Sequence, residues 1–156
     1  MAFEIAKNHL IKKGYADRIM EFEVSSATVE LAAIAVGTEP ARIAKSLTFM
    51  VDDAAVMVIC AGDAKVANSK FKAFFHTKAK MLTYDEVGTL IGHNVGGVCP
   101  FGINFGVKVY LDESLKRFDI VYPACGSDNS AVKLTIPELE DASDYLEWVD
   151  VCNIPE

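Results

Sequence analysis

The stretch IGHNVGGVCPFGI places four glycines and one proline between Gly92 and Gly102, with apolar residues on both sides. Glycine weakens regular structure, so this density is expected where the backbone takes positive φ angles or where another group approaches it closely. A turn of this kind can expose backbone N–H groups that stabilise negative charge developing on a reacting oxygen. A tight packing turn would explain a lone glycine loop equally well.

The histidines and cysteines do not form a recognisable nucleophilic or metal site. His9, His76 and His93 show no Ser-His-Asp order, and His93 is either a turn residue or part of a pocket wall. The four cysteines are scattered, without a CxxC pair or a histidine at zinc-ligand spacing, which predicts reduced thiols, no metal and no cofactor. Cys99 and Cys125 would need a neighbouring base or cation to act as nucleophiles, and packing is the simpler role.

Three further features are ambiguous on sequence alone. Lys45 opens the apolar run SLTFMV, where a lysine is more often a surface residue than a catalytic one. The GSDNS segment, Gly126 to Ser130, is typical of a turn and could also line a site. Phe22 is either a core aromatic or part of a pocket wall.

The net charge of −7 argues against broad, non-specific binding to nucleic acid, which depends on a basic surface. The charge is uneven, however. The segment KVANSKFKAFFHTKAK, residues 65–80, contains no acidic residue, whereas PELEDASDYLEWVD near the C-terminus is strongly acidic. Lys70, Lys72 and Lys78 are therefore candidate contacts to a polyanion, although a solvated helix face would also explain the run.

Length and composition predict one domain over residues 1–156. The chain is 51% hydrophobic and 24% charged, which is ordinary for a globular protein with a single core. No apolar run approaches the ~20 residues of a membrane span. The N-terminal MAFEIAKNHLIKKG lacks the pattern of a signal peptide. We expect a cytoplasmic protein without membrane contact, and the sequence leaves its oligomeric state open.

Helical periodicity and capping residues predict where the helices lie. Gly14 and Gly37 would end the first two helices, Ser25 or Ser26 would cap the second, and Asn68 or Ser69 the third. Thr83 and Glu86 form a capping-box pattern at the start of the next helix. The predicted helical segments are 1–14, 25–40, 68–82, 83–92, a short turn at 114–118, and 136–143.

Strand patterns alternate irregularly with these helices. The segment AKSLTFMVDDAAVMVICAGD predicts a hairpin that turns at Asp52 and Asp53. Other predicted strands are 18–24, 107–112, 118–126, 131–135 and 146–151. This irregular order favours an α+β fold, a single-domain mixed β-sheet packed with helices, over a doubly wound α/β fold.

Three blocks of the sequence occur together in a recognisable order. They are ARIAKSLTFMV around Lys45, the pattern G-x-x-x-G-G-V-x-P-x-G from Gly92 to Gly102, and the looser YPACGSDNSAVKLT. In these blocks the chain resembles the YbaK/ProX family of aminoacyl-tRNA deacylases, which includes the editing domain inserted in bacterial prolyl-tRNA synthetases. The resemblance covers nearly the whole chain. It implies a mixed sheet and a pocket that hydrolyses the ester between a wrong amino acid and the 3′ end of a tRNA.

The resemblance also implies roles for individual residues. Gly96 and Gly97 would let the backbone approach the aminoacyl ester, and Pro100 and Gly102 would shape the turn. Lys45 would hold the terminal adenosine or polarise the ester carbonyl for attack by water. The remaining candidates for contact with the substrate are Phe22, His93, Gly126, Ser127, Asn129 and Ser130.

Two functions follow as expectations. One is a trans-editing hydrolase that deacylates misacylated tRNA, expected to be tRNA(Pro) charged with a small amino acid, with prolyl-tRNA synthetase as a candidate partner and Lys70, Lys72 and Lys78 as tRNA contacts. The other is a non-catalytic module that binds tRNA ends or a synthetase. Family members active on Cys-tRNA(Pro) often carry SGGKRGL where this chain has CGSDNSAV, so the resemblance leaves the amino acid open.

Overall fold

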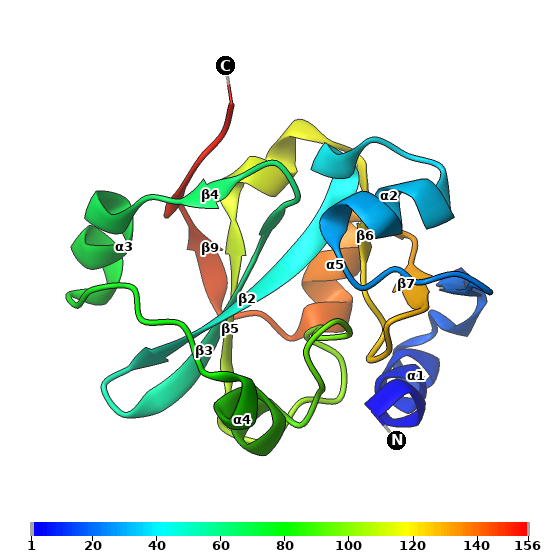
Figure 1. Cartoon of the computed structure of the whole chain (residues 1–156), viewed down its shortest axis with the longest axis horizontal. Coiled ribbons are helices and arrows are strands. Elements are labelled where there is room, and N and C mark those ends of the chain that lie inside the picture. Colours follow the sequence, from blue (N-terminus) through cyan, green and yellow to red (C-terminus); the bar gives the residue numbers. More distant parts are fainter. Residues whose placement is uncertain (1, 156) are drawn as a thin grey trace.

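The computed structural model describes residues 2–155 and is built on a mixed six-stranded sheet of order β8-β6-β2-β3-β5-β9 (Figure 1). Its centre is the antiparallel hairpin of β2 (Ile43–Val51) and β3 (Ala54–Ala61). Asp52 and Asp53 form the turn with positive φ angles of 51° and 62°. Two left-handed residues give a hairpin turn whose twist matches that of the strands. The predicted hairpin is confirmed.

Parallel and antiparallel pairings extend the sheet from this hairpin. On one side β5 (Lys108–Asp112) runs parallel to β3, and β9 (Glu147–Val149) runs parallel to β5. On the other side β6 (Ile120–Pro123) runs parallel to β2, and β8 (Leu134–Thr135) runs antiparallel to β6. The mixed sheet expected for an α+β fold is therefore present.

Two short ladders lie outside the main sheet. In one, β1 (Ile19–Glu21) pairs with β7 (Ser130–Val132); in the other, β4 (Lys65–Val66) pairs with β10 (Cys152–Asn153). The strand predicted over 131–135 is thus divided between β7 and β8. The pairing of β4 with β10 had no prediction, because a two-residue strand carries too little alternation to be recognised.

The helices lie on both sides of the sheet, and in Figure 1 α2 passes in front of the β2–β6 end while α5 lies behind it. The α-helices are α1 (Ala2–Lys13), α2 (Val29–Val36), α3 (Asn68–Phe75), α4 (Tyr84–Glu86) and α5 (Ile136–Ser143). A π-helical turn, η3 (Val87–Ile91), continues α4. Short 3-10 turns are η1 (Ala16–Arg18), η2 (Pro40–Arg42) and η4 (Glu113–Arg117).

Three predicted helix boundaries were wrong. Thr28, not Ser25 or Ser26, caps α2, because its hydroxyl accepts the Leu31 N–H at 3.2 Å while the serines belong to the preceding connection. At the start of α3 the N-cap is Ala67, which makes no side-chain cap hydrogen bond, and not Asn68 or Ser69. The helix predicted over 68–82 ends at Phe75, where His76 adopts a left-handed conformation with φ 60°. The Thr83–Glu86 capping box is confirmed.

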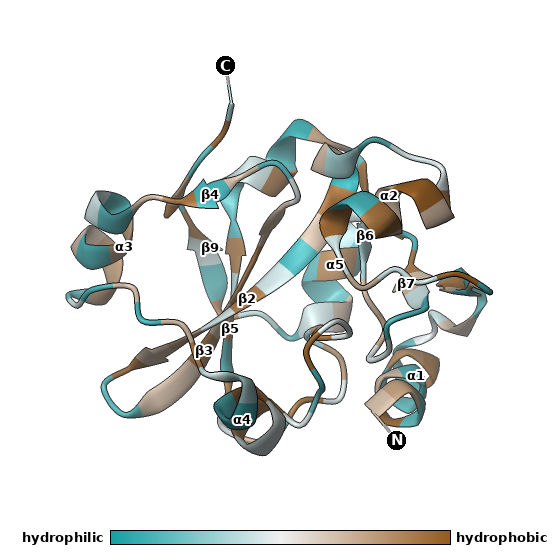
Figure 2. Ribbon diagram, viewed as in Figure 1, coloured by the Kyte–Doolittle hydropathy of each residue, from teal (hydrophilic) through white to brown (hydrophobic). Residues whose placement is uncertain are grey.

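The hydrophobic core centres on β3, where seven of the eight residues are buried, so that both faces of the strand are covered. Figure 2 shows β3 as a hydrophobic band through the molecule. From β2, Phe49 packs on Phe71 of α3 with ring centroids 4.8 Å apart. Phe101, at the end of the glycine loop, is fully buried. The loop is therefore anchored in the core.

Candidate functional site

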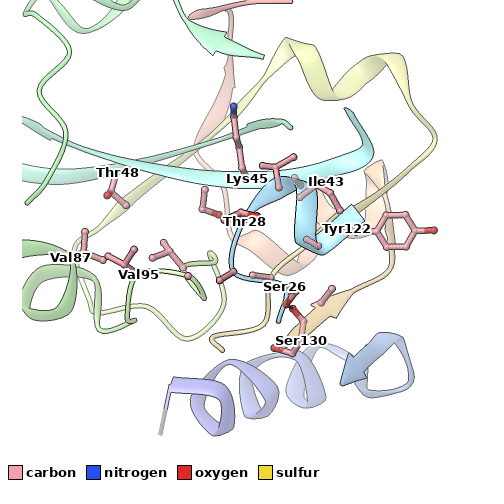
Figure 3. A pocket seen from close by; sticks show the side chains of 18 of the residues that line it. Ser26, Thr28, Ile43, Lys45, Thr48, Val87, Val95, Tyr122 and Ser130 are labelled. Atoms are coloured by element: carbon pink, nitrogen blue, oxygen red, sulfur yellow. Dashed lines mark hydrogen bonds between the residues drawn. The ribbon is translucent and has the colours of Figure 1, made fainter. Parts of the chain in front are cut away.

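A cavity of about 440 Å³ opens where the β2 edge, the start of α2, α4 and the glycine loop meet. Its lining comes from five segments of the chain, within residues 26–32, 43–48, 81–87, 95–98 and 122–131. Figure 3 shows Ser26 and Ser130 together at one end, with Val87 and Val95 toward the other. A cavity of this size and mixed polarity can enclose a small organic group and fix its orientation.

Lys45 lies in the cavity wall, and its ammonium is held by the loop that follows β3. Nζ donates to the carbonyl oxygen of Ala64 at 2.5 Å and to that of Gly62 at 3.3 Å. Figure 3 shows the side chain pointing away from Ser26 and Ser130. Two of the three ammonium hydrogens are therefore occupied, which leaves one for a ligand.

The acidic residue of that loop is paired elsewhere. Asp63 accepts from the Arg117 guanidinium at 2.6 Å, and this interaction lowers the pKa of the Asp63 carboxyl group below its usual value. Arg117 forms the ion pair with Asp63, and Lys45 contributes only a weaker electrostatic attraction to that carboxylate. Within residues 2–155, Lys45 forms no ion pair of its own.

Gly96 and Gly97 have different surroundings. Gly96 lines the cavity with φ 101°, and a Cβ there would lie 3.4 Å from the Cβ of Ala27. Gly97 lies behind the cavity wall, where a Cβ would come within 2.5 Å of the Ser127 nitrogen. Its N–H donates to the Asn94 carbonyl at 3.1 Å. The close approach predicted at Gly97 is therefore to the chain's own backbone.

Three other residues predicted around the turn also lie outside the cavity lining. Gly102 and Gly126 have φ angles of 65° and 78°, and a Cβ at either would meet atoms of α1 at 2.5 Å. Pro100 is also buried. Gly102 and Gly126 thus pack the glycine loop and the 126–130 segment against α1, and the turn-shaping role of Pro100 and Gly102 stays a prediction.

The 126–130 segment brings one residue to the cavity. Ser130 lines it, and its hydroxyl shares a 2.5 Å hydrogen bond with that of Ser127. The Asn129 side chain instead donates to the Phe22 carbonyl at 3.1 Å, and the Phe22 N–H donates to the Asn129 carbonyl at 2.8 Å. Phe22 and Asn129 thus join β1 to this segment and do not form the cavity wall as predicted.

Two residues of the glycine loop, His93 and Cys99, are buried, and so is Cys125. His93 is 1% exposed and its Nδ1 accepts the Cys99 N–H at 3.3 Å, so burial lowers the pKa of the imidazole. Burial also raises the pKa of the Cys99 thiol, and it raises that of Cys125 to about 12. Neutral, enclosed thiols are poor nucleophiles, which supports packing roles for both cysteines.

The three predicted tRNA-contacting lysines lie outside the cavity. Lys70 is bound to the C-terminal segment, since Nζ contacts the Asp150 carboxylate at 3.0 Å and the Cys152 carbonyl at 2.9 Å. Lys72 and Lys78 are exposed and form no ion pair within residues 2–155. The shortened α3 places Lys72 on a helix and Lys78 in the extended segment that leads to α4.

Sequence reasoning missed several residues of the cavity wall. Tyr84 of α4 and Tyr122 of β6 both line it, and Tyr84 is 73% exposed. Ser46, Thr48 and Ser26 add polar atoms. Ser26 had been singled out only as a candidate helix cap, and nothing in the local pattern distinguished Tyr84 or Tyr122 from ordinary helix and strand residues.

Residues 2–155 contain no group of three or more His, Cys, Asp or Glu side chains that could hold a metal ion. No helix in this range is long and apolar enough to cross a membrane.

Comparison with known proteins connects this geometry to a family. The family model described as the aminoacyl-tRNA editing domain matches residues 23–142. The uncharacterized protein YwhH of Bacillus subtilis is 47% identical over 153 residues, which cover 97% of this chain and 98% of that protein.

Two further relatives concern prolyl-tRNA synthetase. The proline–tRNA ligase of Levilactobacillus brevis is 28% identical over 131 residues, which cover 80% of this chain but only 22% of the ligase. A solved structure of a protein proposed to be a trans-editing enzyme for prolyl tRNA synthetase superposes with a TM-score of 0.87 and 27% identity, covering 97% of each chain.

Proposed function

Because the chain belongs to the aminoacyl-tRNA editing domain family, we propose that it is a hydrolase that removes wrongly attached amino acids from the 3′ end of tRNA. One observation carries the proposal: all three sequence blocks that resemble the editing deacylases contribute residues to a single cavity, namely Lys45, Gly96 and Ser130. These residues are far apart in the sequence, and a cavity of about 440 Å³ accommodates an aminoacyl group.

The chemistry proposed for this cavity is attack by water on the aminoacyl ester. The water oxygen bonds to the ester carbonyl carbon, the bond from that carbon to the ribose oxygen breaks, and the products are a free amino acid and a tRNA with a free terminal hydroxyl. The remaining N–H of Lys45 stabilises the oxygen on which negative charge develops. Gly96 keeps that part of the wall free of a side chain.

We place the substrate among tRNA(Pro) species that carry a small wrong amino acid, such as alanine or cysteine. The likeness to a segment of a proline–tRNA ligase supports the choice of tRNA. The whole chain acts in this proposal as one editing domain in the cytoplasm, where it meets charged tRNA and, as a partner, prolyl-tRNA synthetase.

Single-turnover deacylation tests this function. Ala- and Cys-tRNA(Pro) are incubated with excess protein, with correctly charged Pro-tRNA(Pro) as the control, and each hydrolysis rate is compared with the spontaneous rate. We expect acceleration for at least one of the two mischarged substrates and its loss in Lys45→Ala. Hydrolysis at the spontaneous rate throughout a panel that also includes other mischarged tRNAs would reject the hydrolase.

One observation favours the second candidate, a module that binds tRNA ends or a synthetase without hydrolysis. Among residues 2–155, the titratable side chains in the cavity lining are those of Lys45, Tyr84 and Tyr122, so none of them brings a carboxylate or imidazole to the cavity to act as a general base. Measured binding of charged tRNA without accelerated deacylation would select this candidate.

A further inference from the structure

One edge of β2 is open where it borders the cavity. On this edge β6 pairs only with Ile43 and Ala44. Farther along, the segment before α4 resumes the pairing, since the Leu82 N–H donates to the Thr48 carbonyl at 3.1 Å and the Met50 N–H donates to the Lys80 carbonyl at 2.9 Å. Between these two neighbours the strand has no partner on this side.

The strand geometry identifies which backbone groups face the gap. Backbone groups of alternate residues point to the same edge of a strand, and Thr48 and Met50 use this one. Ser46 must therefore direct both its N–H and its carbonyl into the gap. Within the described residues, the Ser46 N–H, the Ser46 carbonyl and the Thr48 N–H have no hydrogen-bond partner.

The cavity lining independently supports this orientation. Ile43, Ala44, Lys45 and Ser46 all line the cavity, and these residues are consecutive. A cavity on one face of a sheet would be lined by alternate residues, whereas a cavity at an open edge is lined by consecutive ones. Residues 81–82 close one end of the gap, and Tyr122 and Ala124 close the other.

Free backbone groups of this kind select a particular ligand chemistry. Nearly all enclosed N–H and carbonyl groups have a partner, so these three groups require water or a ligand. An aminoacyl ester carries an ammonium donor and a carbonyl acceptor on either side of one α-carbon, which is the spacing of the N–H and C=O of a residue in a neighbouring strand.

We propose that the open edge of β2 binds the aminoacyl group as a one-residue strand. The Ser46 carbonyl accepts from the α-ammonium group, and the free N–H of Ser46 or Thr48 donates to the ester carbonyl. This inference rests on the proposed function, because it assumes an aminoacyl ligand. The edge contacts only the α-ammonium and the ester carbonyl, which every aminoacyl group has. Discrimination among amino acids therefore depends on apolar wall residues such as Val29 and Val95.

Amide-to-ester substitution in the backbone tests the proposal. Replacing Ser46 or Thr48 by the corresponding α-hydroxy acid, delivered on a suppressor tRNA, removes that N–H and keeps the side chain. The probe is 3′-alanylamino-3′-deoxyadenosine, whose amide link is not hydrolysed by an esterase. We expect at least one substitution to weaken probe binding about tenfold, the scale of one hydrogen bond, and to slow deacylation of charged tRNA similarly.

Met50 provides a matched control on the same edge. Its N–H is already paired with Lys80, so the ester at Met50 should lower the melting temperature more than the esters at Ser46 and Thr48, and leave probe affinity within about twofold. A second measurement uses N-acetylated Ala-tRNA, which lacks the α-ammonium and should be deacylated more slowly than Ala-tRNA.

The outcomes separate this proposal from the proposed function. Wild-type probe affinity and rate in both the Ser46 and Thr48 esters would overturn the edge while leaving the hydrolase intact. A wild-type protein that binds the probe through the edge but does not accelerate deacylation would keep the edge and reject the hydrolase. A wild-type protein that does not bind the probe would reject the edge.

Discussion

We expect Lys45 to have a structural and a chemical task, because it lines the cavity while its ammonium links β2 to the loop after β3. Lys45→Ala should remove the charge next to the ester and lower the single-turnover rate by roughly 10² or more. It also leaves the Gly62 and Ala64 carbonyls without their donor, so we expect a stability loss of about 1–2 kcal/mol.

The control for Lys45→Ala is Lys45→Arg, with both rates measured at a temperature at which the variants are folded. Arginine keeps the charge but presents a planar set of donors, so it should restore stability more than rate. An alanine variant that deacylates at the wild-type rate would exclude Lys45 from the mechanism.

Gly96 and Gly97 should respond differently to alanine. At Gly97 the new methyl group meets the 126–127 backbone, which cannot move without displacing α1. We expect Gly97→Ala to cost more than 2 kcal/mol of folding free energy, by the scale of overpacked sites. Gly96→Ala has space, although positive φ costs about 1 kcal/mol, and it projects a methyl group at the cavity.

Chemical denaturation and single-turnover kinetics together test this pair of substitutions. Gly97→Ala should lose mainly stability, and Gly96→Ala mainly rate. The opposite pattern would show that Gly97, and not Gly96, meets the substrate.

The buried His93 should make the stability of the fold depend on pH. Burial lowers the pKa of its imidazole below the usual 6.5. Just below pH 6.5 the imidazole is therefore neutral in the folded protein but takes up a proton in the unfolded chain. Stability from this group is therefore present above about pH 6.5 and is lost as the pH falls below that value. In His93→Gln, the decrease in the free energy of unfolding between pH 7 and pH 5 should be smaller than in the wild type.

Comparing the two proteins at each pH removes the contribution of the carboxylates, such as Asp63 and Glu138, whose lowered pKa values act at more acidic pH. Parallel stability curves for wild type and His93→Gln would show that the buried imidazole is not the titrating group.

At the scale of elements, short sequence motifs correctly predicted the turns and helix ends that depend only on neighbouring residues. The Asp52–Asp53 turn, the stop at Gly14 and the Thr83–Glu86 capping box each depend on a few neighbouring residues, and the structure confirms all three. The end of α3 did not follow its pattern, because the chain turns at His76 to bring residues 80–82 alongside β2. The pairing of residues 80–82 with β2 is a tertiary contact, and the residues around His76 give no local signal for it.

The same distinction applies to the candidate site. Lys45, Gly96 and Ser130 were identified because they lie in blocks that resemble a family, whereas Tyr84 and Tyr122 reach the cavity only through the folded arrangement. Asn129 was a candidate because its segment resembles a recognition region of the family, and Phe22 because it could form a pocket wall, but hydrogen bonds join these two residues to each other and away from the cavity lining. Composition could not reveal this pairing.

The exposed aromatic at the start of α4 leads to a prediction for that element. Tyr84 is 73% exposed yet lines the cavity, so its ring is available to a nucleobase that follows the aminoacyl group. Tyr84→Ala should raise the KM for charged tRNA about tenfold, since stacking of one base contributes about 1–3 kcal/mol, and Tyr84→Phe should retain affinity.

Phe105 supplies the matched control for Tyr84, because it is fully exposed but does not line the cavity. Phe105→Ala should leave KM unchanged. Equal effects of Tyr84→Ala and Phe105→Ala would indicate a general surface effect and not stacking at the cavity.

At the scale of the whole molecule, a tRNA is far larger than the cavity and must contact surface beyond it, on a protein whose net charge is −7. The basic segment 65–80 is the candidate surface, but its lysines are not equivalent. Lys72 and Lys78 are exposed, whereas Lys70 is paired with Asp150. A phosphate contact at Lys70 would have to displace that carboxylate, so we expect Lys72 and Lys78 to contribute more.

Replacing Lys72 and Lys78 together by Gln should weaken tRNA binding and reduce the slope of log affinity against log salt by about one to two, because each phosphate contact releases roughly one counterion. Lys70→Gln is the matched control and should change the slope less, while lowering stability through the loss of its contacts to Asp150 and Cys152.

Filter binding of Ala-tRNA(Pro) between 50 and 200 mM salt measures the slopes, a range over which such contacts are well resolved. Binding of 3′-alanylamino-3′-deoxyadenosine, which lacks the rest of the tRNA, should be the same in all three proteins. An unchanged slope in the double variant would mean that the tRNA body approaches the cavity from another side, since the aminoacyl end is fixed by the cavity and the acceptor stem must leave it across one face of the molecule.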